Sequence, residues 1–265
     1  MFFAPAPNPC RAAAIAVLLA ALLTACASRV QIPGSSGNLK LGLSGELHRP
    51  DRSGRLPAAV LLAPCGGVTR HMGEWAAWLN DHGYVTLVVD SFSPRFATDA
   101  CQGGKPTIAD AARDAIDALA YLRSLSFVDP NRVAVIGWSH GAGAALQATS
   151  SLRFRTRPSD SGGEIAFQAA IAFYPPCQFL DSATTTPTLL LLAGRDDWTP
   201  PNQCVAIGER TVGSDRTIVW QLYPTAHHAF DRPDATPYLG HTMVYDSEAA
   251  AASHTAVLKF LSERL

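Results

Sequence analysis

Five consecutive residues, Gly137 to Gly141, read Gly-Trp-Ser-His-Gly and could present a nucleophile. The apolar run before them, residues 133–136, is typical of a strand buried on both faces, and the alanine-rich stretch after them is typical of a helix. Serine at such a strand–turn–helix junction is the pattern of a nucleophile elbow, where glycines let the two backbones approach. The pattern predicts Ser139 as a nucleophile and the backbone N–H of His140 as an oxyanion donor.

A serine hydroxyl needs a base to become nucleophilic, and that base needs an acid to orient it. Two adjacent acids, Asp196 and Asp197, follow the apolar run at residues 188–193. Asp197 is favoured, because it stands three residues after Gly194 and three before Pro200, the usual place for such an acid. Asp196 would then cap or brace the loop.

Two adjacent histidines, His227 and His228, follow the apolar run at residues 217–222 and are candidates for the base. His228 is favoured, because His-x-Phe is the familiar form of this motif, with the aromatic ring of Phe230 buried beneath the loop. His227 would then support the base or face the substrate.

A second oxyanion donor is expected from the sequence Pro-Cys-Gly-Gly at residues 64–67, directly after the apolar run at residues 58–63. Glycines in this loop would let its backbone reach a carbonyl oxygen of the substrate. The amide of Cys65 is favoured, and that of Gly66 comes next.

The elements that must position these residues alternate along the chain between apolar runs and amphipathic stretches. Such alternation predicts an α/β fold in one domain, a mostly parallel twisted sheet with helices on both faces, and ligands bound at the carboxyl ends of the strands. Strands are expected at residues 39–48 (an antiparallel edge strand), 58–63, 84–90, 133–136, 167–173, 188–193 and 217–222. Helices are expected at residues 74–82, after a capping box at Thr107, after Ser139 and from Asp246.

Composition fits one globular domain and excludes one class of partner. The chain has 265 residues, of which 48% are hydrophobic and 16% charged, with a formal net charge of −1. These values are ordinary for a folded α/β domain. Near-neutral charge without a basic run argues against nucleic acid as a partner.

The N-terminal residues have the pattern of an export signal. Residues 12–23 are uninterruptedly apolar, too short for a membrane-spanning helix of about 20 residues but suited to a secretory signal. The following Leu-Thr-Ala-Cys26 resembles a bacterial lipobox, which implies cleavage before Cys26 and lipidation of its thiol. A plain secretory signal cut near Ala25 or Ala27 is the alternative.

Three segments are therefore expected. Residues 1–25 would be a signal peptide of the lipoprotein type. Residues 26–38 would form a flexible tether, or else an irregular lead-in to the first strand, and residues 39–265 would form the folded domain. The protein would lie at the periplasmic face of the bacterial outer membrane, or else be soluble in the periplasm or secreted.

Four motifs stand in order along the chain: Pro-Cys-Gly-Gly, Gly-Trp-Ser-His-Gly, Gly-Arg-Asp-Asp-Trp-Thr-Pro and His-His-Ala-Phe. With them, residues 39–265 resemble the dienelactone hydrolase family within the α/β-hydrolase fold. Ser139 departs from the cysteine nucleophile of the name-giving enzymes and widens the expected chemistry to ordinary carboxylic esters. The resemblance also implies that Arg95, in Ser-Phe-Ser-Pro-Arg, holds a substrate carboxylate; a plain surface arginine is the alternative.

Of the six cysteines, Cys10 would leave with the signal and Cys26 would be lipidated. Four remain, an even number that suits an oxidising compartment. In the fold that the resemblance implies, the strands before Cys65 and Cys101 are neighbours, as are those before Cys177 and Cys204. Disulfides Cys65–Cys101 and Cys177–Cys204 are therefore expected, each bracing a loop of the site. The alternatives are free thiols or zinc ligation, although the chain has no C-x-x-C motif.

The expected function is hydrolysis of a carboxylic ester or lactone through an acyl-enzyme, with Ser139, His228 and Asp197 as the triad and no metal or organic cofactor. Two alternatives remain open from the sequence. One is a serine peptidase or acyl transferase that uses the same triad. The other is a non-catalytic envelope protein that keeps the fold for binding.

Overall fold

The structure is a computed structural model, and it describes residues 26–34, 42–150, 166–210 and 217–265. The predicted signal peptide lies outside these residues. So do residues 35–38 of the predicted tether, residues 39–41 of the predicted edge strand and the segment 151–165.

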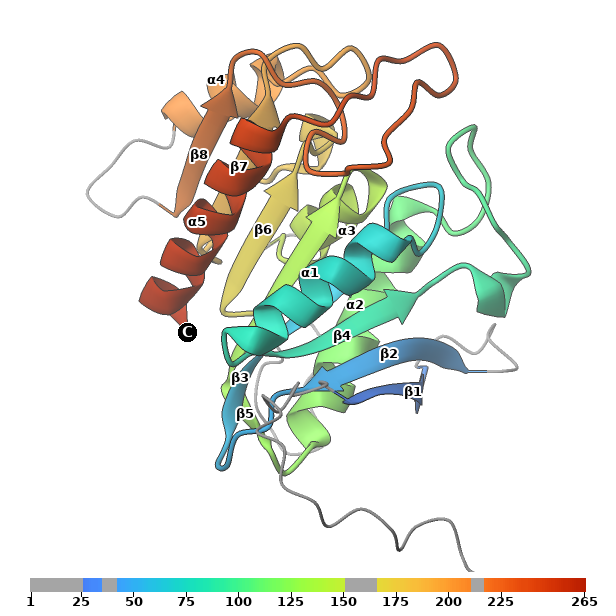
Figure 1. The fold of residues 1–265 in the computed structure, drawn as a ribbon, viewed down its shortest axis with the longest axis vertical. Coiled ribbons are helices and arrows are strands. Elements are labelled where there is room, and N and C mark those ends of the chain that lie inside the picture. The colour runs from blue at the N-terminus through green and yellow to red at the C-terminus, as the bar shows by residue number, and fades with distance from the viewer. Residues whose placement is uncertain (1–25, 35–41, 151–165, 211–216) are drawn as a thin grey trace, which may run out of the picture.

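One twisted sheet organises the described residues, with strand order β1-β2-β4-β3-β5-β6-β7-β8 (Figure 1). The strands from β3 to β8 pair in parallel, whereas β1 and β2 are antiparallel to their neighbours. This confirms the predicted α/β-hydrolase architecture. The strands are β1 (Cys26–Ile32), β2 (Leu43–Arg49), β3 (Leu56–Leu62), β4 (Val85–Asp90), β5 (Val128–Trp138), β6 (Ala169–Phe173), β7 (Thr188–Ala193) and β8 (Ile218–Tyr223).

Helices cover both faces of the sheet, as predicted. In Figure 1, α1 and α5 lie across the face nearer to the viewer. The apolar residues of α1 and α5 pack against one face of the sheet and form one core with it. Helices α2, α3 and α4 pack against the other face. The helices are α1 (Arg70–Asp81), α2 (Ile108–Ser124), α3 (His140–Ala148), α4 (Asn202–Arg210) and α5 (Ser247–Arg264).

Strand β3 shows why the central strands are apolar throughout. Its alternate residues enter opposite cores: Leu61 packs on the side of α1 and α5, and Val60 and Leu62 pack on the side of α2. Because a parallel strand between two helical layers has no solvent-facing side, every position must be apolar. The sequence therefore shows a continuous apolar run instead of an alternating one.

Helix α2 begins at the predicted capping box. The backbone N–H of Asp110 donates to Thr107 Oγ1 at 3.1 Å, and the Asp110 carboxylate accepts from the Thr107 backbone N–H at 2.9 Å. These two bonds satisfy amides that have no partner within the helix. The start of α2 is thereby fixed after a cis Lys105–Pro106 peptide bond.

The start of the described chain differs from the prediction. Residues 26–32, expected to belong to a flexible tether, form strand β1, which pairs antiparallel with β2 from Cys26↔Arg49 to Ile32↔Leu43. Burial drives this pairing, because the side chain of Ile32 is only 1% exposed and packs in the core on the α2 side. The tether prediction is thus wrong for these residues. Helix α4 was also not predicted.

Both predicted disulfides are confirmed, Cys65–Cys101 and Cys177–Cys204. They close loops with sequence separations of 36 and 27 residues. Structural disulfides of this kind indicate export or another oxidising compartment. Among the helices in the described residues, none is long and apolar enough to cross a membrane.

Removing either disulfide should lower the free energy of unfolding by about 3–4 kcal/mol, because each bond limits the entropy of the unfolded chain. Urea unfolding of Cys65→Ala/Cys101→Ala and of Cys177→Ala/Cys204→Ala would measure the two losses separately. Adding a reductant should destabilise the wild type. It should leave the stability of a variant with all four of these cysteines replaced by alanine unchanged. Equal stability of the wild type with and without reductant, once thiol titration shows full reduction, would contradict the prediction.

Candidate active site

Ser139 lies on a sharp turn between β5 and α3, with φ 52° and ψ −112°. The two glycines of the motif permit this turn. A Cβ on Gly137 would collide with the carbonyl oxygen of Gly141, and a Cβ on Gly141 would collide with that of Leu62 in β3. Strained backbone of this kind persists where the surroundings enforce it, often at a functional site. The observed geometry is that of a nucleophile elbow.

Ser139, His228 and Asp196 form one hydrogen-bonded chain. His228 Nδ1 lies 2.8 Å from Asp196 Oδ2, and His228 Nε2 lies 3.0 Å from Ser139 Oγ. Since an ionised carboxylate only accepts, Nδ1 carries the ring proton and Nε2 is left to accept from the serine hydroxyl. All three residues are buried, at 6% exposure or less. His227, the competing histidine, is not among the described residues that line the cavities at Ser139.

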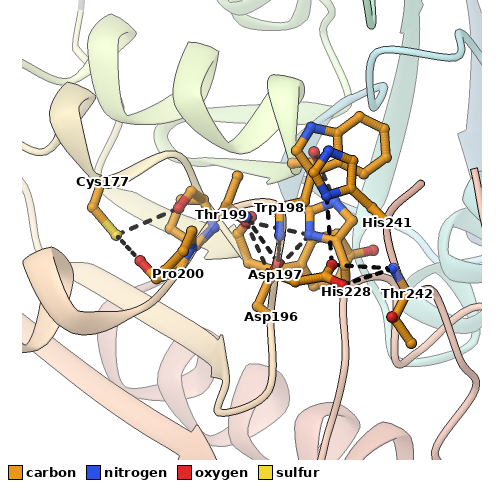
Figure 2. Close-up of polar contacts among 12 residues, drawn as sticks. Cys177, Asp196, Asp197, Trp198, Thr199, Pro200, His228, His241 and Thr242 are labelled. Atoms are coloured by element: carbon orange, nitrogen blue, oxygen red, sulfur yellow. Dashed lines mark hydrogen bonds and ion pairs between the residues drawn. The ribbon is translucent and has the colours of Figure 1, made fainter. Parts of the chain in front are cut away.

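The acid differs from the prediction, which named Asp197. The carboxylate of Asp197 makes no hydrogen bond to His228 among the described residues; instead it accepts from the backbone N–H of Thr242 at 3.1 Å (Figure 2). It also pairs with His241 at 3.5 Å, and its side chain is 45% exposed. Asp196 is the inward-facing acid.

Asp196 both braces the loop and orients the histidine. The sequence analysis had assigned the first role to Asp196 and the second to Asp197. Its Oδ1 accepts from the backbone N–H groups of Trp198 and Thr199, at 2.9 and 2.8 Å, which braces the loop after β7. Its Oδ2 faces His228 (Figure 2). Thr199 Oγ1 lies 3.0 Å from the same Oδ2 and 2.9 Å from the carbonyl oxygen of Tyr174. The loop contacts thus hold the Asp196 carboxylate in the position where it faces His228.

Ser139 lies between two cavities, one of about 620 Å³ and one of about 300 Å³. Both are lined by Ser139, Trp198 and the Cys65–Cys101 disulfide. The larger cavity also has neutral polar side chains and His140 in its wall. The smaller cavity is lined by His228 and also by two charged side chains, those of Asp99 and Arg232. A substrate that spans both cavities would place its scissile bond at Ser139.

The two predicted oxyanion donors are next to the nucleophile. Cys65 and His140 both line the larger cavity beside Ser139. In the part of the chain that the structure describes, neither backbone N–H has an acceptor in the protein. His140 is the first residue of α3, where a helix leaves its amides without intrahelical partners.

With this geometry in place, sequence comparison identifies the family. A family model described as the dienelactone hydrolase family matches residues 43–265. The chain belongs to the dienelactone hydrolase family. It is therefore a carboxylic ester hydrolase, and a non-catalytic envelope protein is no longer a competing interpretation.

Individual relatives of this dienelactone hydrolase family member are distant. A probable 2-oxo-3-(5-oxofuran-2-ylidene)propanoate lactonase from Bradyrhizobium sp. is 25% identical over 211 residues, which cover 74% of this chain and 81% of the relative. A putative dienelactone hydrolase from Klebsiella pneumoniae superposes with a TM-score of 0.71 at 17% identity, over 89% of this chain and 98% of the other. A thermophilic esterase from Thermogutta terrifontis gives 0.70 at 16% identity, over 89% and 92%.

Arg95 is not placed to hold a substrate carboxylate, contrary to the prediction. Its guanidinium donates two hydrogen bonds to Asp114 in α2, at 2.7 and 2.9 Å, and a third to the carbonyl oxygen of Ser91. Asp114 is fully buried. Arg95 is therefore the partner that a buried carboxylate needs, and it lines neither cavity of this hydrolase.

The sequence analysis did not single out Asp231, a buried carboxylate that connects several elements of the site by hydrogen bonds. Asp231 follows His228 by three residues, and its side chain is completely buried. Four donors converge on it at 2.8–2.9 Å: His71 Nε2 and Trp75 Nε1 from α1, Trp138 Nε1 from the residue before Ser139, and Tyr174 Oη from the end of β6.

These contacts shift two pKa values in opposite directions. Burial alone would raise the pKa of Asp231, but the charge of His71 and the hydrogen bonds to the carboxylate outweigh it and hold that pKa below its ordinary value. Burial raises the pKa of Tyr174, and the negative charge of Asp231 raises it further. Asp231 is thus ionised and Tyr174 neutral, as the hydrogen bond between them requires.

Proposed function

We propose that the enzyme cleaves a carboxylic ester or lactone through an acyl-enzyme on Ser139, with His228 as general base and Asp196 as the acid that orients it. The hydrogen-bonded chain from Asp196 through His228 to Ser139 carries this proposal. A buried carboxylate that holds the histidine in one tautomer and stabilises its charged form is what such a base needs.

In the first step, Ser139 Oγ attacks the carbonyl carbon and its proton passes to His228 Nε2. The oxyanion that forms would accept from the amides of His140 and Cys65. When the carbon–oxygen bond to the leaving group breaks, Nε2 returns the proton to the departing oxygen. Water then gives a proton to Nε2, attacks the acyl carbon and releases the acid, with Ser139 Oγ recovering the proton.

The two cavities receive different parts of the substrate in this mechanism. The leaving oxygen must lie where His228 can protonate it, and His228 lines the smaller cavity. The leaving group would therefore occupy the cavity of about 300 Å³ and the acyl group the cavity of about 620 Å³. The printed name of the Bradyrhizobium relative supports including lactones among the substrates. No contact seen here favours a peptidase or acyl transferase over an esterase.

A fluorophosphonate probe tests the nucleophile directly, because it reacts with an activated serine. Mass spectrometry should show one adduct on Ser139 in the wild type and none in the folded Ser139→Ala variant. Pre-treatment with the probe should also abolish hydrolysis of p-nitrophenyl acetate. An adduct on another residue, or equal labelling of Ser139→Ala, would reject Ser139.

We further propose that the protein is an exported lipoprotein anchored at Cys26. The apolar run and the lipobox-like Leu-Thr-Ala-Cys support this, as do the two disulfides. Intact-mass measurement of the mature protein after bacterial expression would test it. A lipid-sized mass increase on an N-terminus at Cys26 is expected, and replacement by Cys26→Ser should release the protein from membranes.

A further inference from the structure

The smaller cavity is lined by two residues whose side chains each hold a polar atom without a hydrogen-bond partner in the described residues. Thr69 and His71 both line it. Thr69 Oγ1 and His71 Nδ1 are each buried, and neither has a hydrogen-bond partner within the described residues. A buried polar atom without a partner costs free energy, so native proteins retain few of them, often for function.

Thr69 is unusual for its position at the start of α1. It is the N-cap residue, and an N-cap threonine ordinarily accepts from the amide two or three residues later. Here the side chain makes no such bond, although the backbone has the extended conformation of a cap (φ −116°, ψ 162°). The hydroxyl is consequently free both to donate and to accept.

The hydrogen bond from His71 to the buried carboxylate of Asp231 fixes the orientation of the His71 ring. Asp231 is ionised and accepts from His71 Nε2 at 2.8 Å, so this nitrogen carries a proton. The other nitrogen, Nδ1, accepts a hydrogen bond when the ring is neutral and donates one when the ring is protonated. A hydroxyl group suits both forms, because it can donate as well as accept.

The charges around the cavity do not favour an anion. Arg232 lines the cavity, but its guanidinium is paired with Asp234 at 2.7 and 3.2 Å. Asp99 lines the same cavity and adds a negative charge, with its carboxylate accepting from Tyr238 Oη at 2.7 Å. With positive charge offset in this way, a neutral group rich in hydroxyls suits the cavity better than a carboxylate does.

We infer that Thr69 and His71 select the leaving group, and that this group is a neutral polyol such as glycerol or a sugar. One hydroxyl of the polyol bonds with His71 Nδ1, and another bonds with Thr69 Oγ1. This inference rests on the proposed function, because it assigns the alcohol half of the ester to the cavity beside His228.

The test compares two butyrate esters of the same shape. One is 2,3-dihydroxypropyl butyrate, and the other is 2-methylbutyl butyrate, in which methyl groups replace the two hydroxyls. The wild type should favour the diol ester by at least about fivefold in kcat/KM, the value expected for two hydrogen bonds of ordinary strength. Thr69→Val and His71→Phe should each lower this ratio of kcat/KM values by about threefold or more, because each removes one hydrogen bond that only the diol ester can make.

Thr69→Val carries the most weight, because the Thr69 hydroxyl makes no bond within the described part of the chain that the change could break. It therefore decides the matter even if loss of a donor to Asp231 unfolds His71→Phe. His82→Phe is the matched control: this histidine is exposed at the other end of α1, lines neither cavity and should keep the wild-type ratio.

Three results would overturn the inference. The first is a wild type that labels at Ser139 and hydrolyses both esters equally, which leaves the proposed function intact. The second is an unchanged ratio in Thr69→Val. The third is a clear preference for carboxymethyl butyrate, whose leaving group is anionic. A folded wild type with neither labelling nor hydrolysis would overturn the proposed function and this inference together.

Discussion

Replacing Asp196 by asparagine should lower kcat about 10³–10⁴-fold, whereas Asp197→Asn should leave kcat within about threefold of the wild type. The isosteric amide at position 196 can donate to His228 Nδ1, which favours the tautomer with the proton on Nε2. That tautomer cannot take the proton of Ser139. Asp197 contacts Thr242 and His241, so its loss affects a surface loop and not the histidine.

The two neighbouring acids make a matched pair, since the changes are chemically identical and one residue apart. Steady-state hydrolysis of p-nitrophenyl acetate would give kcat for each variant, with circular dichroism to verify folding. Asp196→Asn should keep a nearly normal KM, because the carboxylate does not touch the substrate in this scheme. A large loss in Asp197→Asn with normal activity in Asp196→Asn would restore the prediction made from the sequence.

Asp231→Ala should reduce the free energy of unfolding by about 3–5 kcal/mol, the cost of breaking a buried charged network from one side. Four buried donors, from His71, Trp75, Trp138 and Tyr174, would lose their common acceptor. Asp234→Ala is the matched control three residues later. Its side chain is 64% exposed and pairs with Arg232 at the surface, so a loss below about 1 kcal/mol is expected.

The effect of Asp231 should also depend on pH, with a definite sign. Because its pKa is lower in the folded than in the unfolded chain, its contribution is complete above the unfolded pKa, about 4, and is lost as pH falls through the folded value. The stability difference between the wild type and Asp231→Ala should therefore shrink in acid. Denaturant unfolding between pH 7 and pH 3 would measure it, and a difference that grows in acid would contradict the assigned direction.

The sequence predicted most of the fold because buried parallel strands leave a strong signal. Residues 188–193 were expected as a strand and form β7, since a strand covered on both faces admits only apolar side chains. Sequence motifs placed Ser139 and His228 after such strands, and the pairing of the four cysteines followed from the fold that the family resemblance implies. Strand β1 escaped notice because its burial depends on few apolar residues, such as Ile32, in an otherwise polar segment.

The errors in the site share a physical cause. Asp196 and Asp197 lie beyond the end of β7, where no strand periodicity dictates which side chain turns inward. The hydrogen bonds of the loop decide it, and these form only in the folded chain. Asp114 is a charged residue of the amphipathic helix α2, yet it is buried against Arg95. The pattern of polar and apolar residues assigns charged residues to the surface. It does not reveal that two opposite charges will be buried together as a pair.

The antiparallel pairing of β1 determines which way the enzyme would face on a bilayer. Cys26 pairs with Arg49 beside the start of β4, whereas Ser139 follows the end of β5, so the proposed lipid on Cys26 would lie at the opposite end of the strands from the nucleophile. The strands span roughly 20 Å. Since β1 begins at Cys26, no residues outside the sheet would separate such a lipid from the domain. A lipid on Cys26 would hold the entrance to the cavities toward the aqueous periplasm, so that the enzyme meets dissolved esters and not those buried among acyl chains.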